Sequence, residues 1–246
     1  MVKNRKIFWR KLSYNLIPAN CSAFHQYNSS TMQLNNFDGV IFDLDGTLWD
    51  ASGTCTKAWN ATLLQFGITG HVVNEGMIRS FSGRQIEKVF KEQFSFIPSD
   101  QRQDLLELYK INERKFMAEF GGELFPGVRE GLAKIKENYN IFIVSNCLDG
   151  YIENFTDFTG LEKTFVDYES SGRTGLSKAE NIGLIIERNN LKYPVYIGDT
   201  VWDKEAADKV NMPFIHAAYG FGKVDDVYQS IQRFADLHQL LSKTVS

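Results

Sequence analysis

The chain has 246 residues, of which 43% are hydrophobic and 23% charged, a composition that indicates a globular protein with one large domain or one domain carrying an insert. Residues 1–37 contain five basic and no acidic side chains, so subtracting these five charges from the net charge of −3 leaves −8 for residues 38–246. A body this acidic argues against nucleic acid as a partner. No apolar run is long enough to span a bilayer, so no membrane partner is expected either.

Two features bear on where the protein resides. The basic N-terminal extension, residues 1–36, is a targeting peptide, a poorly ordered tail, or a start assigned too early, with Met32 as the true beginning. Its apolar runs are too short and too interrupted for a secretory signal. The cysteines Cys21, Cys55 and Cys147 have neither disulfide nor zinc spacing and fit a reducing compartment, so we expect a cytoplasmic protein.

Beyond the extension, four short apolar runs predict strands that are buried on both faces of a parallel sheet. They are residues 39–44, 141–146, 194–199 and 213–218. Helical patterns stand between these runs, at Val128–Glu137, Lys178–Asn189 and Trp202–Val210. Strands alternating with helices predict an α/β fold with a doubly wound, Rossmann-like parallel sheet. We expect the tail, 224–241, to form a final surface helix.

The interval between the first two runs is too long for a single crossover and has helical patterns throughout. The expected helices are 55–66, 74–80, 84–94 and a long one from the N-cap residue Ser99 to about Phe120. The glycines and proline of GGELFPGV then return the chain to the sheet. We therefore predict a helical cap, 51–122, inserted into an α/β core made of 37–50 and 123–246.

Polar side chains gather where the predicted strands end. Asp43 and Asp45 follow the first strand, Ser145 and Asn146 end the second, and Asp199 and Asp203 follow the third. Ligands bind outside the carboxyl ends of strands in open α/β sheets, so these residues should converge on one site. Three acids in one site repel each other unless a cation neutralises them, and oxygen ligands without His or Cys suit Mg²⁺.

A divalent cation beside an aspartate indicates phosphoryl transfer, because the cation screens the charge between an aspartate nucleophile and an anionic phosphate. Gly46 lets the backbone approach the phosphate and offers an N–H donor. Ser145 and the backbone N–H of Asn146 are candidate partners of the phosphate oxygens. Lys178 can balance the remaining charge, and a lysine at a helix N-terminus, where it is electrostatically unfavourable, favours an anionic partner.

In order and spacing, four motifs resemble those of the haloacid dehalogenase superfamily: DLDGTL (43–48), SN (145–146), Lys178 and GDTVWD (198–203). The resemblance covers about residues 38–223. The insert lies where the helical cap of phosphoglycolate phosphatases and β-phosphoglucomutases is found. The resemblance therefore implies a Mg²⁺-dependent enzyme that acts on phosphate esters.

The resemblance also implies roles for individual residues. Asp43 would attack phosphorus to give an aspartyl-phosphate, and Asp45 would protonate the leaving alcohol and then activate water. Asp43 and Asp199, with the backbone carbonyl of Asp45, would bind Mg²⁺, and Asp203 would act through a metal-bound water or by orienting Lys178. Gly46 and Thr47 would turn the chain beneath the phosphate, which Ser145, Asn146 and Lys178 would bind.

Residues of the insert are candidates for the choice of substrate. Gly83 and Arg84 lie where related caps present a substrate loop, and Arg84 either binds a substrate anion or is a solvated side chain at a helix start. Asp50 is expected to cap the first helix of the insert or to serve as a hinge. The types of these three residues do not specify a particular ligand.

Three functions remain open at the level of sequence. The first is a phosphatase, similar to phosphoglycolate phosphatases, that hydrolyses a small phosphorylated metabolite. The second is a sugar-phosphate mutase similar to β-phosphoglucomutases, although those mutases resemble DGVITD and carry a histidine in the region where this chain has Cys55. The third is a catalytically silent phosphate-binding protein. We expect a monomer or a homodimer.

Overall fold

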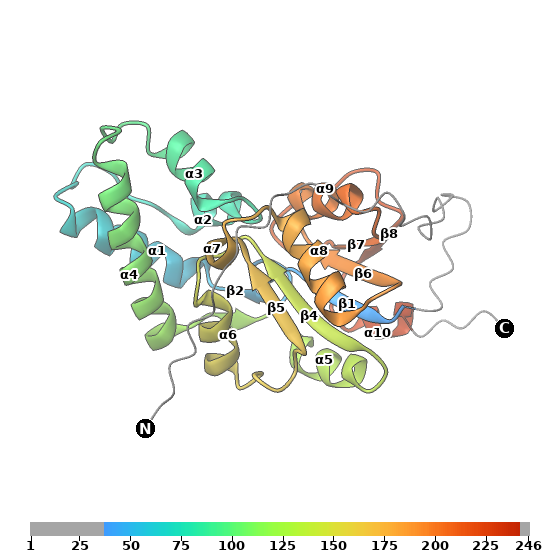
Figure 1. Ribbon diagram of the computed structural model, residues 1–246. Helices are drawn as coiled ribbons and strands as arrows, with labels where there is room; N and C mark the ends of the chain where they lie inside the picture. The colour runs from blue at the N-terminus through green and yellow to red at the C-terminus, as the bar shows by residue number, and fades with distance from the viewer. Residues whose placement is uncertain (1–36, 242–246) are drawn as a thin grey trace, which may run out of the picture. The chain divides into compact units, whose positions relative to one another are not determined.

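The computed structural model describes residues 37–241, so the predictions for the extension 1–36 lie outside the described residues. Six strands in this part form one parallel sheet in the order β5-β4-β1-β6-β7-β8 (Figure 1). They are β1 (Gly39–Phe42), β4 (Asn140–Ser145), β5 (Asp167–Ser170), β6 (Pro194–Gly198), β7 (Phe214–Ala217) and β8 (Gln229–Ile231). The predicted α/β fold with a parallel sheet is confirmed.

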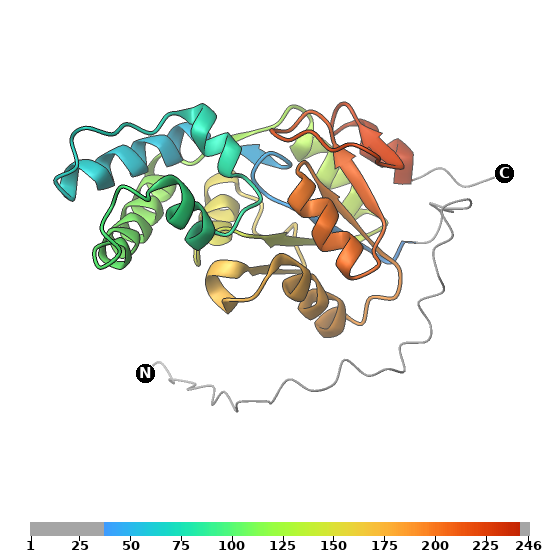
Figure 2. The same ribbon diagram turned by 90° about the horizontal axis from the view of Figure 1, so that it is seen from above.

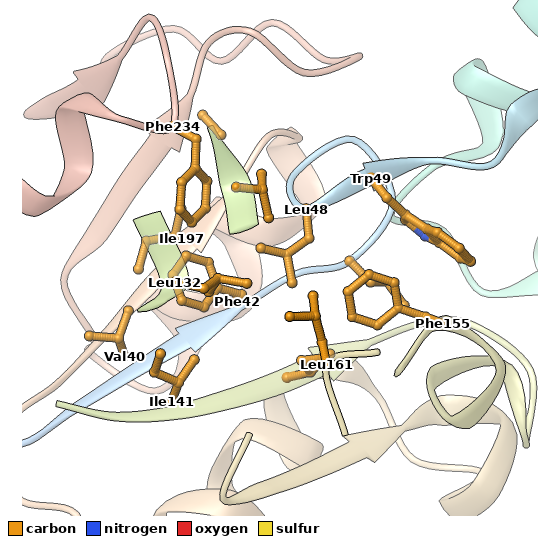
Figure 3. Close-up of a cluster of buried hydrophobic side chains, with 14 of the residues drawn as sticks. Val40, Phe42, Leu48, Trp49, Leu132, Ile141, Phe155, Leu161, Ile197 and Phe234 are labelled. Carbon is orange, nitrogen blue, oxygen red and sulfur yellow. The ribbon is translucent and has the colours of Figure 1, made fainter. Parts of the chain in front are cut away.

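Helices cover both faces of this sheet, as a doubly wound fold requires. Val40 and Phe42 of β1 share an apolar core with α5 (Val128–Lys136), α6 (Tyr151–Thr159) and α10 (Asp236–Leu241), part of which is shown in Figure 3. Ile41 lies in a second core with α8 (Lys178–Asn189) and α9 (Val201–Lys209). Successive side chains of a strand point to opposite faces, so the continuous apolar run of β1 supplies both cores.

Four helices lie between β2 (Trp49–Asp50) and β3 (Glu123–Leu124), which pair with each other antiparallel where the chain leaves and rejoins the sheet region. They are α1 (Ser52–Gln65), α2 (Glu75–Phe81), α3 (Ile86–Gln93) and α4 (Arg102–Phe120), and α1 packs against α4 (Figure 2). The ring of Trp59 stacks on Tyr109, with 3.8 Å between centroids, in an apolar core that these helices share. We call them the cap helices; the exact cap boundaries, 51 and 122, stay a prediction.

The structure corrects the expectation for the tail and adds elements that were not expected. The tail is not one helix, because Gln229–Ile231 pair with β7 as strand β8 and only Asp236–Leu241 are helical. Ile231 and Phe234 are buried in the sheet core, so tertiary packing outweighs the local pattern. Neither β5 nor α6 is predicted from the sequence.

Ser99 is not the N-cap of the long cap helix, which begins at Arg102 without a side-chain cap. The guanidinium of Arg102 instead donates from Nε to the carbonyl of Ile97 at 2.9 Å, which ties the helix start to the preceding turn. At the other end the helix stops at Gly121, as the glycine pair in the sequence predicts. Within residues 37–241 none of the helices is both long and apolar enough to cross a bilayer.

Candidate active site

The carboxyl ends of three neighbouring strands bring together the polar residues singled out by the sequence. Asp43 follows β1, Ser145 ends β4, and Asp199 follows β6. Because β1 pairs in parallel with both β4 and β6, these three ends lie at the same edge of the sheet. Lys178, at the start of α8, and Asp203, in the first turn of α9, reach the same place.

Lys178 forms the electrostatic centre of this site. Its ammonium group is buried and donates to Oδ1 of Asp43 at 2.8 Å and to Oδ1 of Asp203 at 2.5 Å. Burial by itself lowers the pKa of Lys178, but the two carboxylates outweigh burial and raise the pKa well above its ordinary value. Lys178 is therefore a permanent cation held between two acids.

Asp203 uses both of its carboxylate oxygens within the protein. Oδ1 accepts from Lys178, and Oδ2 accepts from the backbone N–H and the hydroxyl of Thr200, at 2.9 and 2.6 Å. Thr200 and Asp203 form a reciprocal capping box at the start of α9, which fixes the Asp203 side chain. This geometry suits a residue that orients Lys178.

Asp43 is buried, and its pKa is raised to about 6. Desolvation is the main cause, the nearby charge of Asp203 adds to it, and Lys178 opposes both. Since Lys178 occupies Oδ1, the ion pair also fixes the orientation of the carboxylate. Asp43 thus combines partial loss of solvation with a defined geometry, which are the properties of an activated nucleophile.

Asp199 is fully buried, and backbone and hydroxyl donors orient it. Oδ1 accepts from the Thr47 hydroxyl at 3.2 Å, and Oδ2 accepts from the backbone N–H of Phe221 at 2.8 Å. Burial, followed by the charges of Asp203 and Asp43, raises the pKa of Asp199 well above its ordinary value. Ionised Asp199 therefore needs a positive partner.

Gly46 makes room for that carboxylate. Its φ is +86°, and a Cβ at this position would lie 2.7 Å from the carboxyl carbon of Asp199. The expectation that the Gly46 N–H is free to bind a phosphate is wrong for this structure, because that N–H donates to the carbonyl of Trp49 at 2.9 Å. The Thr47 N–H likewise donates to Leu44 at 3.2 Å, so both donors close the turn.

The site has the donor set of a hard cation. One carboxylate oxygen from each of Asp43, Asp199 and Asp203 lies within 4.8 Å of the others, and all three residues are buried. Only oxygen ligands are present in this group, which is the chemistry of Mg²⁺ sites rather than of zinc sites. The backbone carbonyl of Asp45 accepts from the Ser82 hydroxyl at 3.0 Å, and a carbonyl has a second lone pair for another partner.

Asp45 lies partly exposed at the cavity described below. Its Oδ1 accepts from the hydroxyl of Tyr151, at the start of α6, at 2.7 Å. Desolvation raises the pKa of Asp45 to about 7, the Tyr151 hydrogen bond opposes this shift, and the charge of Asp43 adds to it. A carboxyl with a pKa near neutrality can both donate and accept a proton at pH 7.

The loop between α2 and α3 contacts this site through backbone groups. Asn146 donates from Nδ2 to the carbonyl of Gly83 at 2.8 Å, while its Oδ1 accepts from the Ser171 hydroxyl at 2.5 Å. Gly83 has a φ of +76°, and a Cβ there would lie 2.5 Å from the Thr200 hydroxyl oxygen. Glycine at this position therefore permits close approach between the loop and the strand ends.

The remaining predicted residues have defined partners as well. Arg84 forms an ion pair with Glu92 and lies over the ring of Trp202, so its charge is already compensated. Asp50 accepts from the backbone N–H of Ser52 at 2.8 Å and forms an ion pair with Arg79 at 2.8 Å. Asp50 thus links the start of α1 to α2 at the β2–β3 pair.

A cavity of about 100 Å³ opens above Asp43 and Asp45. Ser145, Asn146, Gly83 and Arg84 line it, together with apolar side chains of the cap helices. Five polar residues that the sequence analysis did not single out also line it: Ser52, Ser82, Tyr109, Glu113 and Tyr151. One signal for Glu113 exists in the sequence, because it lies four residues from both Tyr109 and Met117 on the buried stripe of α4.

A doubly wound α/β sheet whose strand ends hold an acidic cluster and a buried lysine defines an enzyme active site of the kind that handles anionic substrates. The sequence matches the model of the haloacid dehalogenase-like hydrolases over residues 40–217, and the chain belongs to this family. It is therefore a hydrolase. A search of curated proteins found no match.

Solved structures with the same fold include proteins named as phosphatases. A predicted phosphatase from Clostridium acetobutylicum is 23% identical, with a TM-score of 0.73, over 82% of this chain and 97% of that one. A predicted phosphoglycolate phosphatase from Haemophilus somnus is 17% identical, with a TM-score of 0.70, over 85% and 99%. CbbY from Rhodobacter sphaeroides, in complex with xylulose-(1,5)bisphosphate, is 16% identical, with a TM-score of 0.68, over 82% and 96%.

Proposed function

We propose that the protein is a Mg²⁺-dependent phosphatase that hydrolyses a small phosphorylated metabolite through an aspartyl-phosphate intermediate. The observation that carries the proposal is the pair of carboxyls at one cavity, one paired with a buried lysine and the other with a pKa near neutrality. The first, Asp43, suits a nucleophile, and the second, Asp45, suits an acid and base. The names of the phosphatase structures with this fold support the same branch of the family.

In the first step, Oδ2 of Asp43 attacks phosphorus, since Lys178 occupies Oδ1. The P–O bond to the leaving alcohol breaks, and the carboxyl proton of Asp45 passes to the alcohol oxygen. In the second step a water oxygen attacks phosphorus, and Asp45 takes the proton from that water. The bond between phosphorus and Asp43 breaks, so that inorganic phosphate leaves and both aspartates return to their starting states.

The other residues hold the phosphoryl group and the acids in place. Lys178 balances charge at Asp43, and Asp203 orients Lys178 through Oδ1. Ser145 and the backbone N–H of Asn146 bind phosphate oxygens at the end of β4. Asp43, Asp199 and the carbonyl of Asp45 would hold Mg²⁺, which supplies neutralisation of the phosphate charge during the reaction.

The walls and the size of the cavity support the proposal that the substrate is small. The cap helices and the loop at Gly83 together contribute most of its wall, and this loop contacts Asn146 directly, so water is restricted around the reacting group. A space of about 100 Å³ suits a metabolite with a few carbon atoms better than a segment of protein or nucleic acid.

A panel of small phosphate esters, assayed with Mg²⁺ and with EDTA, tests this proposal. We expect phosphate release that needs Mg²⁺ and is lost in Asp43→Asn, while Asp208→Asn, which changes an exposed aspartate on α9, keeps full activity. Turnover in EDTA, or full activity of Asp43→Asn, would contradict the mechanism. An isomerised sugar phosphate would identify a mutase, and binding without turnover of any ester would identify a silent phosphate-binding protein.

A further inference from the structure

The two carboxyls of the proposed reaction have different kinds of partner. Asp43 is oriented by a cation, because Lys178 donates to its Oδ1 at 2.8 Å. Asp45 forms no ion pair within residues 37–241, but its Oδ1 accepts from the hydroxyl of Tyr151 at 2.7 Å. This length is typical of a hydroxyl that donates to a carboxyl group. Tyr151 thus stands at Asp45 as Lys178 stands at Asp43.

The Tyr151 side chain is itself held firmly. It is 3% exposed and begins α6 directly after Gly150, whose φ is +84°. Its ring packs edge-on against Trp49, with 5.7 Å between centroids and 80° between the ring planes. Trp49 is fully buried, and its carbonyl accepts from the backbone N–H of Gly46 at 2.9 Å. The turn that follows Asp45 therefore also fixes the ring that carries the hydroxyl.

The hydrogen of the Tyr151 hydroxyl is committed to Asp45. A phenol has one hydrogen to donate, and an ionised carboxylate only accepts. Sγ of Cys55, at the start of α1, lies 3.9 Å from the Tyr151 oxygen, and in this arrangement its S–H is the donor. Tyr151 lines the cavity but has no second hydrogen for a substrate. Its hydroxyl therefore acts on the reaction through Asp45.

A partner on Oδ1 decides which oxygen of Asp45 exchanges protons. A neutral carboxyl carries a single O–H, and with Oδ1 accepting from Tyr151 that hydrogen lies on Oδ2. The leaving alcohol then takes its proton from Oδ2, and in the second step the attacking water returns a proton to the same oxygen. Without the hydroxyl of Tyr151 the carboxyl can turn, and its proton is no longer directed at the alcohol oxygen.

We propose that Tyr151 is the positioning residue of the acid and base Asp45, holding Oδ1 so that Oδ2 exchanges protons with the leaving alcohol and with water. The inference rests on the proposed phosphatase function, in which Asp45 protonates the leaving group. It assigns a role to a residue of the α/β core rather than of the cap helices, since Tyr151 belongs to α6.

Two phosphates of similar size, propyl phosphate and acetyl phosphate, separate positioning from a structural role. Propanol needs a proton as it leaves, whereas acetate leaves without one, because acetic acid is a far stronger acid than an alcohol. The ratio kcat/KM reports the steps up to departure of the leaving group, so the role of Asp45 as a base does not enter. We expect Tyr151→Phe to lower kcat/KM about 10- to 100-fold for propyl phosphate and less than about threefold for acetyl phosphate.

Two further variants complete the comparison. Asp45→Asn, which removes the acid, should show the same split with a larger loss for propyl phosphate. Tyr168→Phe is the matched control, because it removes a hydroxyl that donates to another carboxylate, that of Glu153 at 3.2 Å, and it should affect neither substrate. Equal losses for both substrates in Tyr151→Phe would overturn the inference, since a defect in folding or a direct contact with the phosphoryl group lowers both alike.

A measurement without turnover keeps the two proposals apart. Urea unfolding of the wild type, Tyr151→Phe, Asp45→Ala and the double variant forms a cycle that isolates the interaction between the two side chains. We expect Tyr151→Phe to cost less stability in the Asp45→Ala background than in the wild type, and equal costs would refute the hydrogen bond. If the wild type releases phosphate from neither substrate, the phosphatase function fails, while a smaller cost in the Asp45→Ala background still shows that Tyr151 holds Asp45.

Discussion

Gly46→Ala is the substitution for which the structure gives the most definite cost. The residue has a φ of +86°, which costs an alanine about 1–2 kcal/mol. The new Cβ would also lie 2.7 Å from the carboxyl carbon of Asp199 and 2.8 Å from its Oδ1, and overpacking at a rigid site costs about 1–3 kcal/mol more. Asp199 is buried and hydrogen-bonded, so it cannot move away freely.

The control for this substitution is Gly67→Ala. Gly67 has a φ of +84°, and no atom lies within 4 Å of the position of its Cβ, so it carries the backbone cost without the clash. We expect urea unfolding to show a loss of about 1–2 kcal/mol for Gly67→Ala and a clearly larger loss for Gly46→Ala. Gly46→Ala should also need more Mg²⁺ for half-maximal turnover. Equal losses of stability with an unchanged Mg²⁺ requirement would refute the reasoning.

Three further predictions follow from the acids of the site and its cavity. Because burial raises the pKa of Asp45 to about 7 and the first step needs its proton, kcat/KM should fall as the pH rises above about 7, and a flat profile from pH 6 to 9 would exclude Asp45 as the acid. Asp199→Asn should raise the Mg²⁺ concentration needed for half-maximal activity about 10–100-fold, measured by titration into EDTA-treated enzyme, with Asp208→Asn as the unaffected control. Burial raises the pKa of Glu113 from 4.5 to about 8, so the folded state holds its proton between these values while the unfolded state does not. Wild-type stability should therefore decrease as the pH rises from about 4.5 to about 8, and Glu113→Gln should flatten this slope in urea unfolding at several pH values; an identical slope in both proteins would argue against a buried neutral Glu113.

The sheet could be predicted from the sequence where a strand is buried on both faces. The runs that contain β1, β4, β6 and β7 are continuously apolar, and this pattern has few other interpretations. β5, with the sequence DYES, and β8, with QSI, carry no such run. Their pairing with β4 and β7 at the two edges of the sheet stabilises them, and a local pattern does not contain that information.

The residues at the strand ends of the site could be predicted for a related reason. Asp43, Ser145 and Asp199 stand directly at strand ends, so predicting the strands was enough to bring them together. The partners of these residues were less predictable. That the N–H of Gly46 closes its own turn, and that Tyr151 reaches Asp45 from an unpredicted helix, depends on the path of the backbone after each strand.

The substrate preference depends on contacts of a different kind. Ser52, Glu113 and Tyr151 lie on three helices and meet only because α1 packs against α4 and α4 packs against α6. No sequence spacing links these residues, whereas the reacting groups are linked by the fixed geometry of a parallel sheet. The reaction class can therefore be inferred from strand ends alone, but the ligand requires the packing of the helices. Glu113, a carboxyl on the buried stripe of α4, illustrates this, because its burial conflicts with its polarity and only the packing of α4 brings it to the cavity.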